Sequence, residues 1–181
     1  MIGKTIGELG AGDHAELTRR VETTDLAGFI STVGDFNPVH SDAAYAATTP
    51  FKVPIAPGIF TAGLISAVIG TRLPGPGAIY LSQSLKFSKP VKAGDTITAQ
   101  VVVRDVIRER NRIRLETTCT NQRGEEVLSG EAWVMPSNVH IVYVVARLAA
   151  AAGARLARQP GAWAAPAMTA GATMVTSGAR R

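Results

Sequence analysis

The order of the expected elements indicates an α+β fold, in which an antiparallel sheet packs against one buried helix. Residues 59–71 (IFTAGLISAVIGT) are apolar nearly all round, which is typical of a buried helix, and they are too few to cross a membrane. Residues 78–135 then read as successive strands separated by short turns. A helix followed by consecutive strands is the pattern of an antiparallel α+β fold.

Before the buried helix, the sequence predicts one strand and two short helices. Residues 15–23 alternate and are rich in β-branched side chains, which favours a strand. Residues 26–33 have apolar side chains at helical spacing, with an N-cap at Thr24 or Asp25. A second short helix through position 47 follows, and the residue before it at position 41 or 42 is a serine or an aspartate, either of which is a good N-cap.

The strands after the buried helix show alternation of apolar and polar side chains. In the clearest case Ile113, Leu115, Thr117 and Cys119 fall on one side of their segment. Strands are expected at 78–87, 96–106, 112–121 and 127–135.

The charge distribution separates residues 1–136 from the rest of the chain. They hold 14 basic and 14 acidic side chains, whereas residues 137–181 hold five arginines and no acid, which accounts for the net charge of +5. The neutral part has no excess of positive charge that would favour nucleic acid. The single cysteine, Cys119, predicts no internal disulfide and no cysteine-based metal site. This fits a cytoplasmic location, and residues 1–9 lack the apolar core of a signal peptide.

The most informative stretch is GDFNPVH, which holds a carboxylate and an imidazole five residues apart. On a regular helix or strand, side chains at this spacing diverge. A turn can bring them together, because glycine permits unusual dihedral angles and proline fixes its own φ and restricts the residue before it. The stretch therefore predicts a rigid turn that aims a candidate base and acid at one point. The alternative is a helix-breaking turn with a capping aspartate and a surface histidine. The residues concerned are Gly34, Asp35, Asn37, Pro38 and His40.

This G-D-x-N-P-x-H pattern resembles the signature of the MaoC-like hydratases, and the resemblance extends from about Ile6 to Pro136, including LPGPGAIYLSQSLKF at 73–87. It implies a hot-dog fold, in which the sheet wraps around the central helix. It also implies an (R)-specific 2-enoyl-CoA hydratase, which reversibly adds water to trans-2-enoyl-CoA to give (R)-3-hydroxyacyl-CoA. Residues 1–136 are therefore expected to form the hydratase domain.

Residues 137–181 depart from the family pattern. The sequence of residues 139–158 is compatible with a basic amphipathic helix. Residues 159–181 are rich in Ala, Gly and Pro and have few large apolar side chains that could be buried. The whole segment is expected to be a poorly ordered tail. The alternative is a contact with a second copy of the chain or with an acidic surface.

The resemblance implies a catalytic set of Asp35, His40 and Gly58. Hydration of an enoyl thioester needs a base for water, a proton for the α-carbon and donors for the enolate oxygen. Asp35 suits the base role, and His40 can hold the water or pass a proton. The backbone N–H of Gly58 is the candidate oxyanion donor, because it falls at the expected start of the central helix. The family has a His-Gly pair here, and Pro57 replaces that histidine.

Four further residues are expected to bind substrate or to shape its site. Asn37 is expected to tie the loop together. Ser66, about two helical turns after Gly58, matches a pocket-facing serine of the family or is a packing residue. Ile69 is an acyl-pocket wall or simply core. Trp133 aligns with a smaller pocket residue, so a bias towards short acyl chains follows if it faces the pocket.

No separate cofactor and no metal are expected, since coenzyme A is part of the substrate. The resemblance implies a homodimer, with pockets between the subunits. Two other functions stay open, namely a hot-dog acyl-CoA thioesterase and a non-catalytic acyl-CoA binding module. The basic residues that are candidates for the phosphates of coenzyme A are Lys86, Lys89, Lys92 and Arg104.

Overall fold

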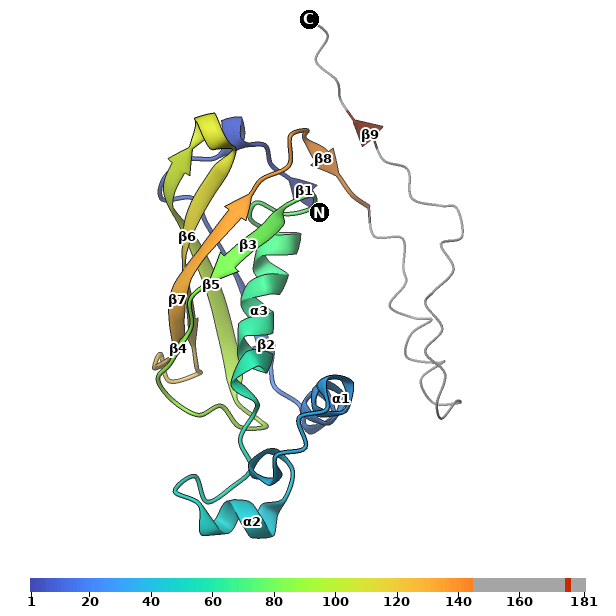
Figure 1. Ribbon diagram of the computed structural model, residues 1–181, viewed down its shortest axis with the longest axis vertical. Helices are drawn as coiled ribbons and strands as arrows, with labels where there is room; N and C mark the ends of the chain where they lie inside the picture. The colour runs from blue at the N-terminus through green and yellow to red at the C-terminus, as the bar shows by residue number, and fades with distance from the viewer. Residues whose placement is uncertain (145–174, 177–181) are drawn as a thin grey trace, which may run out of the picture.

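The computed structural model describes residues 1–144 and 175–176, and it has one face of an antiparallel sheet covered by helix α3 (Gly58–Thr71) (Figure 1). The strands of the main sheet are β2 (His14–Arg20), β3 (Ile79–Gln83), β4 (Lys86–Phe87), β5 (Thr96–Ile107), β6 (Arg112–Thr120) and β7 (Glu126–Met135). Their order is β2-β5-β6-β7-β3, and β4 also pairs with β7. The predicted α+β architecture is confirmed.

The core lies between α3 and the sheet. In the first part of β5 every second side chain is buried, as the alternation of a sheet with one covered face requires. These side chains meet the buried side of α3, where Ile65 and Val68 have no exposed surface. The fully buried residues of the central strands include Ile97, Ala99, Val101, Val103, Ile113, Leu115, Ala132 and Val134.

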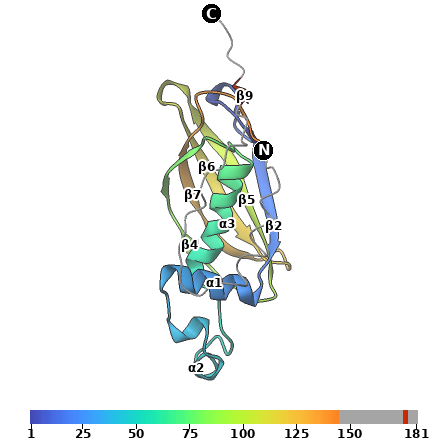
Figure 2. The ribbon, with the colours of Figure 1, turned by 90° about the vertical axis from the view of Figure 1, so that its right-hand side faces the viewer.

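The chain between β2 and α3 lies beyond the N-terminal end of α3 (Figure 2). It contains α1 (Thr23–Val33), the 3₁₀ helix η2 (Pro38–His40) and α2 (Ala43–Thr48). The buried side of α1 consists of Leu26 and Ile30. The rings of Phe29 and Phe60 meet edge to face at 5.8 Å, which joins α1 to α3. This region is therefore fixed against the helix that begins beside it.

The boundaries of the first helices correct one expected cap and confirm another. The α1 helix begins at Thr23 with Glu22 as its N-cap, so the expected cap at Thr24 or Asp25 is wrong. Asp25 instead accepts a hydrogen bond from the Glu22 N–H at 3.3 Å. In α2 the Asp42 side chain does cap the helix, because Oδ1 accepts from two backbone N–H groups.

A small second sheet, not expected from the sequence, lies at the other end of α3 (Figure 1). It has the order β1-β8-β9, with β1 (Ile2–Gly3), β8 (Ile141–Val142) and β9 (Val175–Thr176). At Gly3 the backbone of β1 passes close to the loop that follows α3, since a Cβ on Gly3 would lie 2.0 Å from the carbonyl oxygen of Pro76. The remaining short elements are the 3₁₀ helices η1 (Ile6–Glu8) and η3 (Arg108–Arg110).

The small sheet corrects part of the expectation for the end of the chain. A helix from residue 139 is wrong for residues 141–142, which form β8. His140 Nδ1 lies 2.8 Å from a carboxylate oxygen of Glu8, which fastens this segment to the start of the chain. Residues 145–158 of the expected helix lie outside the described residues, and so do 159–174 and 177–181 of the tail. The domain boundary after Pro136 stays a prediction.

Candidate active site

The turn after α1 brings Asp35 and His40 together. Gly34 ends the helix with φ of 75° and ψ of 19°, the left-handed conformation that favours glycine. Its N–H still donates to the Ile30 carbonyl oxygen at 2.9 Å. Pro38 then begins η2, which ends at His40, so the chain reverses between the two side chains. The predicted turn is confirmed.

Asp35 and His40 form a close pair. Asp35 Oδ2 lies 3.5 Å from His40 Nε2. The other ring nitrogen, Nδ1, lies 2.8 Å from the carbonyl oxygen of Ile55. Nδ1 therefore carries a hydrogen and donates it, which directs Nε2 towards the carboxylate. The His40 side chain is 11% exposed and that of Asp35 is 43% exposed, so an imidazole held in place meets a carboxylate that water reaches.

Asn37 holds the turn between them. Its Oδ1 accepts from the Val39 N–H at 3.3 Å, and its own N–H donates to Asp35 Oδ1 at 3.4 Å. The expectation that Asn37 ties the loop together is confirmed. These bonds orient the carboxylate of Asp35 relative to the backbone. A contact between Asn37 and substrate stays a prediction.

Substitution of Gly34 by Ala should lower the free energy of unfolding by about 1 kcal/mol, because its positive φ is costly for an L side chain. No neighbouring atom lies within 4 Å of where the new Cβ would stand, so the cost comes from the backbone alone. Gly28→Ala is the matched control in the same helix, where the space is equally open and φ is not positive. It should stabilise by about 0.5–1 kcal/mol. Urea unfolding measures both, and effects of the same sign would contradict the strained turn.

Gly58 is the first residue of α3, as predicted. Pro57 precedes it with φ of −55° and ψ of 132°. Within the described part of the chain, the Gly58 N–H has no hydrogen-bond acceptor. It belongs to the free N–H groups of a helix start, where the helix dipole favours negative charge. A Cβ at this position would lie 2.7 Å from Cε1 of Phe87, so the ring of Phe87 would have to move to admit any side chain here.

Two cavities meet at His40, which lines both of them. The first has a volume of about 410 Å³ and extends past Gly58 towards Phe51 and Phe87. The second, of about 510 Å³, lies beside α1 and reaches Lys92. The imidazole of His40 therefore contributes to the walls of both cavities.

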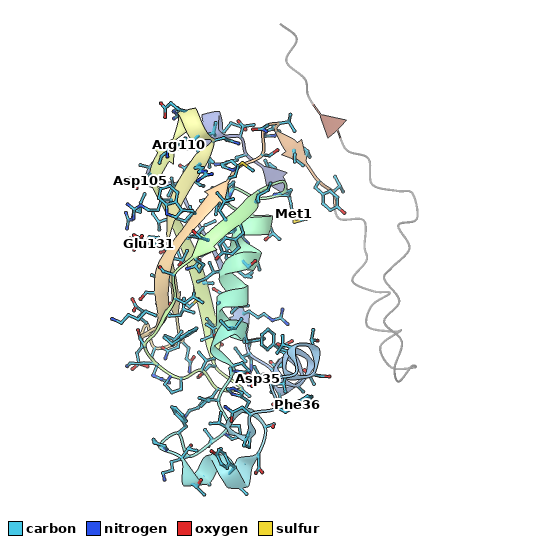
Figure 3. All side chains as sticks on the ribbon, viewed as in Figure 1. Met1, Asp35, Phe36, Asp105, Arg110 and Glu131 are labelled. Atoms are coloured by element: carbon cyan, nitrogen blue, oxygen red, sulfur yellow. The ribbon has the colours of Figure 1, made fainter. Side chains whose placement is uncertain are left out.

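Three residues predicted to line the substrate site lie elsewhere in the described protomer. Ser66 is exposed on the outer side of α3. Ile69 is 2% exposed and belongs to the core. Trp133 lines a separate hollow with Arg110, and Figure 3 places Arg110 at the opposite end of the sheet from Asp35. None of the three lines a cavity that contains His40, and their contacts with substrate stay predictions.

Two of the basic residues proposed for phosphates lie at the cavities. Lys89 lines the first cavity and Lys92 the second. Lys89 is also paired with Glu125 at 2.6 Å. Hydrogen bonds from Asn121, Lys89 and Arg123 lower the pKa of Glu125 to about 2, so this carboxylate stays charged and holds Lys89 at neutral pH.

The other two lie away from the cavities. Arg104 pairs with Glu116 at 2.8 Å. Lys86 is exposed on β4 and lines neither cavity.

Sequence reasoning missed Phe51, Phe87 and the carbonyl group of Ile55. Phe51 and Phe87 come from segments far apart in the chain, and they meet only because β4 pairs with β7 beside the start of α3. The sequence could not show that the carbonyl oxygen of Ile55 accepts a hydrogen bond from His40, because every residue has a backbone carbonyl. One feature of the sequence pointed to a close neighbour at Gly58, because a glycine at the start of a helix often marks a place where another group packs against the backbone. It did not identify that neighbour as Phe87.

Metal ligands do not cluster in the described residues, where no three His, Cys, Asp or Glu side chains are placed to hold an ion. In the same residues, no helix is long and apolar enough to span a membrane.

Comparison with known proteins gives a consistent set of relatives. The family model described as "MaoC like domain" matches residues 7–124. A 3-hydroxybutyryl-CoA dehydratase of Methylorubrum extorquens is 51% identical over 127 residues, covering 70% of this chain and 80% of the relative. An (R)-specific enoyl-CoA hydratase of Rhodospirillum rubrum is 48% identical, covering 71% and 88%. The solved R-hydratase PhaJ1 of Pseudomonas aeruginosa is 44% identical with a TM-score of 0.76, covering 81% and 94%.

Proposed function

The chain belongs to the MaoC-like domain family, and from this premise we propose that it is an (R)-specific 2-enoyl-CoA hydratase with the hot-dog fold. It adds water reversibly to trans-2-enoyl-CoA and gives (R)-3-hydroxyacyl-CoA. The observation that carries the proposal is the Asp35–His40 pair, because His40 lines the cavity that also contains Gly58 at the start of α3. The stereochemistry comes from the named relatives.

The pair supplies the proton transfers. A water molecule between the Asp35 carboxylate and His40 Nε2 loses a proton to the pair as its oxygen bonds to C3 of the enoyl group. The pair then gives a proton to C2, so it ends the cycle in its starting protonation state. In the reverse direction the same groups remove the C2 proton and protonate the leaving hydroxyl.

Gly58 stabilises the negative charge formed during the reaction. When water attacks C3, charge moves onto the thioester oxygen. The unpaired N–H at the start of α3 is a preformed donor for that oxygen, and the helix dipole adds to the effect. Pro57 has no backbone N–H, so the first N–H that this end of α3 can offer to the thioester oxygen is that of Gly58.

The hydratase assay is the loss of the conjugated enoyl absorbance of crotonyl-CoA, with free thiol followed in parallel. Loss of absorbance without thiol release is the expected result. Release of thiol would assign the chain to the thioesterases, in which water attacks the carbonyl carbon. Binding of crotonyl-CoA with neither signal would indicate a non-catalytic acyl-CoA binding module. We also propose a cytoplasmic location, which the absence of any cysteine pair in the sequence supports.

We further propose a homodimer that pairs through β3. The outer edge of β3 has no partner strand in the described chain. Two apolar side chains of this strand, Ile79 and Leu81, are also left 51% and 41% exposed. Long apolar edges are normally covered. Beside Asp35, Phe36 is 73% exposed (Figure 3), so a second copy would also shield the catalytic turn.

Ile79→Lys should convert the dimer to a monomer of 19.0 kDa in light scattering, because a charge in the proposed interface must be desolvated. Thr18→Lys is the control on β2, at the opposite edge of the sheet. It should leave the mass of the dimer unchanged. A dimer that persists in Ile79→Lys, or is lost in Thr18→Lys, would contradict pairing through β3.

A further inference from the structure

Thr61 is a buried polar residue of α3 whose hydroxyl bonds to no other group of the described chain. The residue is 3% exposed. Its carbonyl oxygen has a contact on β6, but its hydroxyl makes no hydrogen bond within the described residues. Thr32 in α1 and Thr71 in α3 differ, because each donates to the carbonyl oxygen four residues earlier, at 2.8 and 2.6 Å. A buried hydroxyl without a partner costs free energy, so that of Thr61 calls for a partner from outside this part of the chain.

The hydroxyl of Thr61 faces the 410 Å³ cavity, which this residue lines together with Gly58 and His40. In the described residues, the one buried side-chain oxygen or nitrogen that has neither a partner nor accessible surface is Asn111 Oδ1. Thr61 Oγ1 also lacks a partner, so it retains accessible surface. Because the residue is otherwise buried and borders this cavity, that surface belongs to the cavity wall.

The other hydrogen-bonding side chains at this wall of the cavity already have partners. Ser88 lines the cavity, but its hydroxyl donates to Glu126 at 3.2 Å. Lys89 lines it as well and donates to Glu125 at 2.6 Å. Most of the remaining lining residues are aliphatic or aromatic. A hydrogen bond from Thr61 would therefore form in surroundings of low dielectric, where it is stronger than in water.

Thr61 lies one helical turn after Gly58, on the same side of α3. Residues three positions apart are neighbours on the surface of a helix. Helical side chains also tilt towards the N-terminus, so the side chain of Thr61 covers the turn that begins at Gly58. The hydroxyl and the free N–H of Gly58 can therefore donate to one atom held at the start of the helix.

We propose that the Thr61 hydroxyl is a second hydrogen-bond donor to the thioester oxygen of the substrate, beside the N–H of Gly58. The inference rests on the proposed hydratase function and adds a side chain to its oxyanion site. In the free enzyme, water can accept the hydrogen of the hydroxyl. The thioester oxygen takes the place of that water, and the bond strengthens as negative charge moves onto the oxygen. Thr61 neither gains nor loses a proton.

Thr61→Val tests the hydroxyl directly, because valine has nearly the same shape and carries a methyl group in its place. The kcat for crotonyl-CoA should fall about 10²-fold, the usual effect of removing one oxyanion donor. KM should change much less, since the bond is strongest in the transition state. The melting temperature should stay the same or rise, because no partner in the described chain is lost. A kcat within about threefold of the wild type would overturn the proposal.

Two further variants give the comparison. Thr61→Ser keeps the hydroxyl, so its kcat should stay within about fivefold of the wild type, although loss of a buried methyl group should lower the melting temperature. Thr71→Val is the matched control on the same helix, and Thr71 lines neither cavity at His40. Its kcat should equal that of the wild type. A purely structural hydroxyl at Thr61 would give the reverse pattern, with a lower melting temperature and an unchanged kcat in Thr61→Val.

Binding of acetoacetyl-CoA separates this inference from the hydratase proposal. This thioester has no double bond to hydrate, and it ionises to an enolate that absorbs in the ultraviolet and carries part of its charge on the thioester oxygen. The wild type should raise the enolate absorbance of the bound ligand, because donors to that oxygen favour the charged form. Thr61→Val should raise it less, and Thr71→Val should raise it as much as the wild type does.

The two measurements together assign each outcome. If crotonyl-CoA is not hydrated and the enolate absorbance depends on Thr61, the function fails and the donor stands. If crotonyl-CoA is hydrated and Thr61→Val changes neither kcat nor the enolate absorbance, the donor fails alone. A lower kcat with unchanged enolate absorbance would place the hydroxyl against the attacking water and would overturn its assignment to the thioester oxygen.

Discussion

Asp35→Asn should lower kcat/KM for hydration of crotonyl-CoA by about 10²–10⁴-fold, the usual contribution of a general base. The amide keeps the size of the carboxylate but does not accept a proton from water. Asn37 donates its N–H to Asp35 Oδ1, and the amide oxygen introduced by the substitution can accept the same bond, so the turn should survive. Ultraviolet absorbance measures the rate, and thermal unfolding checks the fold.

Asp105→Asn is the matched control. This carboxylate is similarly exposed, at 48%, but it is paired with Arg114 on the far side of the sheet (Figure 3). Exposed ion pairs contribute little to stability, so Asp105→Asn should hydrate crotonyl-CoA at the wild-type rate. Activity of Asp35→Asn within about tenfold of the wild type would contradict a role for Asp35 as base.

Substitutions of His40 should separate its two nitrogen atoms. His40→Asn places an amide N–H near the position of Nδ1, where it can still donate to the Ile55 carbonyl oxygen, but it removes Nε2. The hydration rate should fall by about 10²-fold or more, because the partner of the Asp35 carboxylate is lost. The melting temperature should change little.

His40→Gln is the complementary variant, because its amide reaches towards Nε2 and lacks the bond to Ile55. It should lower activity as well, and it should also lower the melting temperature, since a partly buried carbonyl group loses its donor. If His40→Asn kept full activity, Nε2 would have no part in the proton transfers.

Much of the fold could be predicted because its strong signals are local. The apolar segment 59–71 is stable only when it is covered by a sheet, and α3 begins one residue earlier, at Gly58. Alternation in 96–106 and 112–121 predicted β5 and β6 nearly to the residue. Gly34 and Pro38 predicted a turn for reasons of backbone sterics, and that turn is present.

The features that could not be predicted depend on distant partners. The two-residue strand β8 has too few residues to show a period, and it forms because β1 lies beside it. In β7 the adjacent Trp133 and Val134 are both apolar, so composition does not say which one faces α3. The structure buries Val134 and puts Trp133 on the other side. The 410 Å³ cavity at His40 could not be predicted either, because its walls come from separate segments of the chain.

The native thiol of Cys119 can report on the packing of α3 against the sheet without the introduction of another cysteine. It is the only cysteine in the sequence and is fully buried on β6, with Sγ 3.9 Å from the Thr61 carbonyl oxygen of α3. Burial raises its pKa to about 12, so almost no thiolate is present at neutral pH. A thiol reagent in the crotonyl-CoA assay will therefore register coenzyme A against a silent protein background. In a separate experiment without substrate, the rate at which a thiol reagent labels Cys119 measures how often the contact between α3 and the sheet opens.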